Sequence, residues 1–81
     1  MKIYDYHGKK NICGKKLRIA RISRSLRQED LAAKLQVEDV IIERDGISRI
    51  ENGTRFVSDY ELLTFAKVLG VSVNWLLGID E

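Results

Sequence analysis

The lack of any covalent or metal staple is the strongest constraint on what so short a chain can fold into. The 81 residues include one cysteine, Cys13, which excludes an internal disulfide and an all-cysteine zinc cage. The fold must therefore be held by its apolar core, and packed helices build a small core most economically. Hydrophobic residues make up 44% of the chain, enough for one such core, and the sequence contains no proline, which argues against turn-dense β architectures.

Apolar spacing and capping signals predict five short helices. Cys13, Leu17 and Ala20 lie on one face of a first helix, which is expected to begin near Asn11 and to end near residues 23–25. The other four are expected from about Gln28 to Leu35, from about Arg44 to Asn52, between a capping box at Ser58–Glu61 and Gly70, and between Ser72 and Gly78. The predicted fold class is all-α, a compact five-helix bundle.

A second apolar stripe on the first helix is formed by Ile12, Ile19 and Ile22. Two stripes on one short helix predict burial on two sides, the second against residues 1–10. Those ten residues are expected to form a basic arm, and three of them are available to anchor it: Ile3, Tyr4 and Tyr6.

The charge is divided unevenly along the chain. Residues 1–27 carry nine lysines and arginines against one acid, whereas residues 28–81 carry five against eleven. The net charge of +2 hides this division. A strongly basic first third indicates a polyanionic partner.

No stretch of the sequence indicates a membrane or an export route. The first residues lack the apolar core of a signal peptide, and no run approaches the roughly 20 apolar residues that span a bilayer. A soluble cytoplasmic protein, associated with the nucleoid in a bacterial or phage setting, is expected.

Three sequence blocks, in order, resemble the lambda-repressor-like (Cro/repressor type) helix-turn-helix family. They are Gln-Glu-Asp-Leu-Ala at 28–32, Ile-Ser-Arg-Ile-Glu-Asn-Gly at 47–53 and Ala-Lys-Val-Leu-Gly-Val-Ser at 66–72. The resemblance covers about residues 11–78, between the arm at 1–10 and a tail at 79–81. It implies a five-helix DNA-binding domain, a transcriptional regulator that acts as a homodimer on double-stranded DNA.

The resemblance also implies which residues read the bases. A recognition helix at about 44–52 would enter the major groove, where Arg44 and Arg49 suit guanine and Asp45 suits the cytosine amino group. Gly46 would allow close approach to the DNA. The DNA backbone would be contacted by six residues: Gln28, Ser48, Asn52, Arg55, Lys15 and Lys16. Further positive potential would come from Lys9, Lys10, Arg18, Arg24 and Arg27.

Other matched positions imply structural roles. Arg21 and Glu51 match a family ion pair, predicted here to be largely buried and architectural. Apolar character and the resemblance together suggest a dimer surface of Phe56, Val57, Trp75 and Leu77. Cys13, on the core face, is expected to be inert packing.

The sequence departs from the family pattern in the turn before the recognition helix. About five extra residues, within 36–41, either extend the second helix or lengthen the loop. Arg27 and Glu43 stand where the family carries capping Ser or Thr. Four acids crowd the expected DNA-facing end: Glu38, Asp39, Glu43 and Asp45. Their repulsion of phosphates would be offset only if they paired with Arg44, Arg49 and Arg55 or bound cytosine bases.

These acids keep a second function open. The chain could be a protein-interaction module, such as an antitoxin-type partner, with the same fold and weak DNA binding. Catalysis is not expected, because the sequence has one histidine, one cysteine and no phosphate-cradling glycine loop. No metal and no cofactor are expected either.

Overall fold

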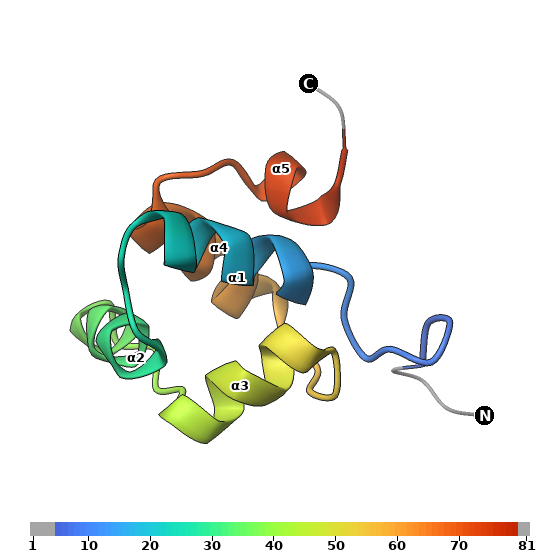
Figure 1. The fold of residues 1–81 in the computed structure, drawn as a ribbon, viewed down its shortest axis with the longest axis horizontal. Coiled ribbons are helices and arrows are strands. Elements are labelled where there is room, and N and C mark those ends of the chain that lie inside the picture. Colours follow the sequence, from blue (N-terminus) through green and yellow to red (C-terminus); the bar gives the residue numbers. More distant parts are fainter. Residues whose placement is uncertain (1–4, 80–81) are drawn as a thin grey trace.

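The computed structural model describes residues 5–79, and its secondary structure there is five helices around one core (Figure 1). The helices are α1 (Gly14–Ser23), α2 (Gln28–Val37), α3 (Arg44–Asn52), α4 (Asp59–Leu69) and α5 (Val73–Leu77). The predicted all-α class is confirmed. Ile3, Tyr4 and the last two residues of the tail lie outside the described residues.

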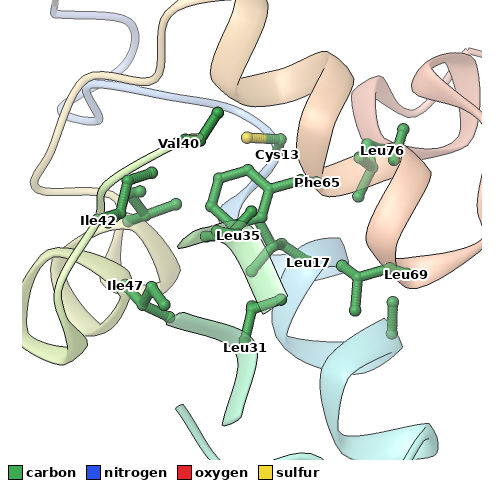
Figure 2. Close-up of a cluster of buried hydrophobic side chains, with 13 residues drawn as sticks. Cys13, Leu17, Leu31, Leu35, Val40, Ile42, Ile47, Phe65, Leu69 and Leu76 are labelled. Carbon is green, nitrogen blue, oxygen red and sulfur yellow. The ribbon is translucent and has the colours of Figure 1, made fainter. Parts of the chain in front are cut away.

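The central element of the bundle is α1. It packs against α3 on one side and α5 on the other, as Figure 1 shows, and it also contacts α4. The Phe65 side chain of α4 is fully buried and lies in the middle of the core (Figure 2). Thirteen buried apolar residues form this core, among them Leu17, Leu31, Leu35, Ile47, Ile50, Leu69 and Leu76.

The helix ends follow the predicted capping signals. The Ser58 hydroxyl accepts a hydrogen bond from the Glu61 backbone N–H at 3.4 Å, and the Glu61 carboxylate accepts one from the Ser58 N–H at 2.9 Å. Gly70 ends α4 with a φ of 68°, which favours glycine. At α2, which lacks a Ser or Thr cap, the Asp30 carboxylate instead accepts the Arg27 backbone N–H at 2.8 Å.

The second stripe of α1 is not buried, so that expectation is wrong. Ile12, Ile19 and Ile22 are about half exposed, at 53%, 52% and 49%. At 100° per residue Ile19 and Ile22 project from the side of α1 opposite Leu17, and Ile12 precedes the helix. Residues 5–10, the described part of the arm, leave all three about half exposed. Tyr6, expected as an anchor, is also exposed.

The extra residues of the turn divide between helix and loop. Helix α2 continues to Val37, and residues 38–43 then form a loop in which Asp39 has a φ of 62°. Val40 and Ile42 fold into the core, which ties this loop down. Val37 and Ile41 project outward, 80% and 69% exposed.

Candidate nucleic-acid interface

Helix α3 presents one polar face to the surface. Ile47 and Ile50 are fully buried on its inner side. Five residues, exposed or half-buried, lie around the remaining sides: Arg44, Asp45, Ser48, Arg49 and Asn52. The structure thus brings the three expected base-reading residues onto one exposed helix surface. The Arg44 guanidinium lies 3.8 Å from the Asp45 carboxylate, and both side chains are well exposed.

A buried polar network holds α3 to α1 and α2. The Glu51 carboxylate accepts hydrogen bonds from Arg21 Nε at 2.6 Å and from Arg21 Nη2 at 3.1 Å. Arg21 Nη1 also donates to the Leu26 carbonyl at 2.7 Å. The bond to Glu51 raises the pKa of Arg21 and outweighs the lowering effect of burial, so the guanidinium keeps its charge.

Gln28, the expected backbone-contacting residue, belongs to the same network. Its amide nitrogen donates to Glu51 Oε1 at 3.1 Å, and its side chain is half-buried. The amide therefore connects α2 to α3. Gln28 is the first residue of α2, and its backbone N–H remains at the open end of the helix, where anions bind.

The arm is fastened to the C-terminal end of α3, which the sequence did not indicate. The Lys10 N–H donates to the Gly53 carbonyl at 2.8 Å, and Lys9 Nζ donates to the Asn52 carbonyl at 3.2 Å. The Asn11 amide donates to the Ile50 and Arg55 carbonyls, at 3.0 and 2.8 Å. Lysines suit this end of a helix because its carbonyl groups carry partial negative charge.

A groove of about 800 Å³ opens between the arm, the start of α1 and the end of α3. Lys9, Lys15 and Arg18 lie along it, and Asn52 connects it to the exposed face of α3. Three cations beside the polar face of α3 make this end of the molecule suited to a phosphate backbone.

Two expected backbone contacts are directed elsewhere. Lys16 points toward α5, with its ammonium 4.9 Å from the centre of the Trp75 ring, while α3 lies on the other side of α1 (Figure 1). Arg55 Nη2 lies 3.2 Å from Glu61 Oε2, and its Nη1 donates to the Phe56 carbonyl at 2.9 Å. The positive charge of Arg55 is therefore largely offset by the Glu61 carboxylate of the same chain.

The Glu61 carboxylate interacts both with Arg55 and with the start of α4. Burial by itself would raise the pKa of Glu61, but the hydrogen bonds from Arg55 and from the Ser58 backbone N–H outweigh burial and lower it. The carboxylate thus links the capping box of α4 to the segment that follows α3.

Packing within the protein explains why residue 46 is a glycine. A Cβ at this position would lie 2.9 Å from Ile42 Cγ2 and 3.7 Å from Arg55 Nε. Because Ile42 is part of the core, the small residue is needed for packing of the lengthened turn against α3. Close approach to DNA is not required to explain it.

The acids of the turn are only partly offset. Glu38 forms an ion pair with Lys67, and Asp45 pairs with Arg44. Glu43 and Asp39 are exposed beside the start of α3, and Arg55 pairs with Glu61 instead of with them. Some negative charge therefore remains near the expected DNA-facing end.

The residues expected at a dimer surface lie around α5 and the segment before α4. Phe56 is 42% exposed, and Val57, Trp75 and Leu77 are half-buried. Val57 and Trp75 also pack against the core, so they contribute to the fold in a single copy.

Comparison with known protein families identifies the domain. A family model described as a helix-turn-helix domain matches residues 13–75, well over half of the chain. No curated protein matches the sequence significantly. None of the helices among residues 5–79 is long and apolar enough to cross a lipid bilayer.

Proposed function

Because the chain belongs to the helix-turn-helix domain family, we propose that it is a sequence-specific transcriptional regulator of double-stranded DNA, most simply a repressor. Helix-turn-helix domains bind DNA by placing their second helix in the major groove. The observation that carries the proposal is the exposed polar face of α3, with the basic groove directly at its end.

In this proposal, α3 supplies the sequence preference. Arg49 and Arg44 have the donors for a bidentate bond to guanine, and Asp45 can accept from a cytosine amino group. The buried Arg21–Glu51 pair fixes α3 relative to α1, so these side chains are presented on a rigid support. The role is binding, without a catalytic step.

The DNA backbone contacts are proposed on either side of α3. Asn52, Lys9, Lys15 and Arg18 would meet phosphates along the basic groove. The backbone N–H of Gln28 would meet phosphates at the start of α2, and Ser48 would meet them at α3. Lys16 and Arg55 are left out of this set, because Lys16 lies toward Trp75 of α5 and the guanidinium of Arg55 is paired with Glu61.

The repressor is proposed to act as a homodimer on a two-fold DNA site, through the surface around Phe56, Val57, Trp75 and Leu77. Dimers of this kind bind half-sites roughly one helical turn (~34 Å) apart. Such a regulator works where the DNA is, so we place it in the cytoplasm, at the nucleoid.

The lengthened turn supports a second candidate, a protein-interaction module of the antitoxin type. Val37 and Ile41 are exposed beside the acids Asp39 and Glu43, a combination suited to a basic, apolar protein partner. In this alternative, replacing Asp39 and Glu43 by lysine abolishes partner binding without changing DNA affinity.

Selection of bound sites from random duplex DNA tests the function directly. The expected result is an enriched motif with two-fold symmetry. Its affinity, measured by fluorescence anisotropy, should fall steeply with salt, because several phosphates release counterions. No enriched motif together with a salt slope near zero would contradict the proposal.

A further inference from the structure

The side chain of Asn11 joins three segments of the chain. Its Nδ2 donates to the Ile50 carbonyl at 3.0 Å and to the Arg55 carbonyl at 2.8 Å. Its Oδ1 accepts a hydrogen bond from the Gly14 backbone N–H at 2.9 Å. One half-buried amide therefore connects the start of α1 to the last turn of α3 and to the segment before α4.

The close crossing of α1 and α3 brings Asn11 within reach of α3. A Cβ at Gly14 would lie 2.0 Å from the Ile50 carbonyl oxygen, so the missing side chain leaves room for this carbonyl beside α1. The same carbonyl accepts the Gly53 backbone N–H at 3.0 Å. Asn11 thus meets α3 at its C-terminal end, where helix carbonyls need partners from outside the helix.

Two further hydrogen bonds run from the arm to this end of α3. They join the Lys10 backbone N–H to the Gly53 carbonyl and Lys9 Nζ to the Asn52 carbonyl. The bond from Lys9 is exposed to solvent, whereas those from Asn11 are partly buried. Because a hydrogen bond is stronger away from water, Asn11 is the firmer of these side-chain attachments.

The arm is held in place against the repulsion of like charges. Lys9 lies along the basic groove with Lys15 and Arg18, and the sequence has no acid between residues 6 and 27. Glu51 also lines the groove, but its carboxylate is bound by Arg21. Repulsion among the cations would move a free arm away from α1, and phosphates would remove that repulsion.

We propose that Asn11 is a positioning residue for DNA binding, which holds the arm so that Lys9 lies beside α1 and α3 before DNA arrives. Asn11 itself touches no DNA. An arm that is ordered in advance loses less conformational entropy on binding than a free arm does. This role rests on the proposed function and adds a residue outside its set of DNA contacts.

Asn11→Ser removes the tether and keeps the cap of α1. A serine hydroxyl can accept the Gly14 N–H as it does at other helix starts, but its single donor cannot serve two carbonyls. Asn11→Asp is the second variant if the first does not fold, because its carboxylate also caps α1 and has no donor. Ile12→Asp, at an exposed neighbouring position, controls for the added charge. Circular dichroism gives the temperature range in which each variant is folded.

Backbone ¹⁵N relaxation without DNA tests the tether by itself. In the wild type, the amide order parameters of residues 6–10 should be close to those of α1, at about 0.85. In Asn11→Ser they should fall toward about 0.6, while those of α3 stay constant. Unchanged order parameters in the arm would show that Asn11 does not hold it.

A double-mutant cycle on the selected DNA site, measured by fluorescence anisotropy, tests the positioning. Asn11→Ser should weaken binding about tenfold, because the arm must then be ordered on the DNA. Lys9→Ala should cost clearly less affinity in Asn11→Ser than in the wild-type background, since the two residues act together. Arg49→Ala should cost the same in both backgrounds, because the Arg21–Glu51 pair still holds α3.

Three other results overturn the inference or its premise. If Lys9→Ala costs equally in both backgrounds, Asn11 serves the fold alone. If Asn11→Ser also abolishes the cost of Arg49→Ala, Asn11 acts through α3 and not through the arm. Absence of DNA binding by the wild type would overturn the proposed function itself, and the relaxation data would still show whether Asn11 holds the arm.

Discussion

Arg21 and Glu51 form an ion pair that is almost fully enclosed: Arg21 Nε lies 2.6 Å from Glu51 Oε2, and the side chains are 10% and 2% exposed. Because Gln28 donates to the same carboxylate, one acid joins three helices. Such an enclosed pair fixes geometry, and the geometry it fixes is that of α3.

Removing the acid should destabilise the fold strongly. Glu51→Ala leaves the Arg21 guanidinium buried without its partner, which costs about 3–5 kcal/mol of unfolding free energy. Urea unfolding followed by circular dichroism measures this loss. Arg18→Ala is the control, since Arg18 is 4.0 Å from Glu51 but its side chain is 61% exposed, and it should cost less than about 1 kcal/mol. Equal losses in the two variants would contradict the structural role.

The crossing of α1 over α3 depends on Gly14. A Cβ there would lie 2.0 Å from the Ile50 carbonyl oxygen, so Gly14→Ala must push the two helices apart. Overpacking of this kind costs about 1–3 kcal/mol, against a gain of about 1 kcal/mol in helix propensity. The thermal midpoint should fall for Gly14→Ala and stay nearly constant for Lys15→Ala, at the next and exposed position. A rise for Gly14→Ala would mean that α1 and α3 are not so closely packed.

Much of the fold follows from the sequence because it depends on local signals. The predicted end of α3 at Asn52, the capping box at Ser58 and the stop at Gly70 are all confirmed. Each is a short-range match between a side chain and the backbone a few residues away. The family membership likewise follows from local blocks in order.

The remaining features depend on contacts between distant segments. Asn11 binds carbonyl groups 39 and 44 residues away, and Gly14 is needed because of a carbonyl group in α3. Backbone carbonyls carry no sequence signature, so periodicity could not reveal where the arm attaches. The same applies to Lys16 and Arg55, whose partners Trp75 and Glu61 lie on other elements and compete with the expected phosphate contacts.

Acid should weaken the fold partly through Glu61. The pKa of Glu61 is lower in the folded protein than its ordinary value of 4.5. Its contribution to the free energy of unfolding is therefore complete above the ordinary value of 4.5 and is lost as the pH falls toward the pKa of the folded protein. Glu61→Gln keeps the capping box, in which Gln can replace Glu, but removes the charge facing Arg55. Urea midpoints measured between neutral pH and pH 3 should therefore fall less steeply for Glu61→Gln than for the wild type. Parallel pH profiles would contradict the assignment.

The lone thiol should be unreactive in the folded protein. Burial raises the pKa of Cys13 to about 11, because the thiolate is poorly solvated there. At pH 8, a thiol reagent should modify Cys13 far more slowly in the native protein than in urea. The variant Cys13→Ala with Ile12→Cys moves the thiol to an exposed position and should react rapidly without urea. Rapid native reaction of Cys13 would show that the start of α1 opens frequently.

The most direct test of the central claim compares Arg49→Ala with Lys15→Ala on the selected DNA site and on an unrelated duplex. If α3 reads bases, Arg49→Ala should cost about 1–3 kcal/mol on the selected site, relax preference at one base pair and change affinity for the unrelated duplex little. Lys15→Ala should weaken both duplexes alike and reduce the salt slope by about one. Equal losses on both duplexes for Arg49→Ala would contradict sequence reading by α3.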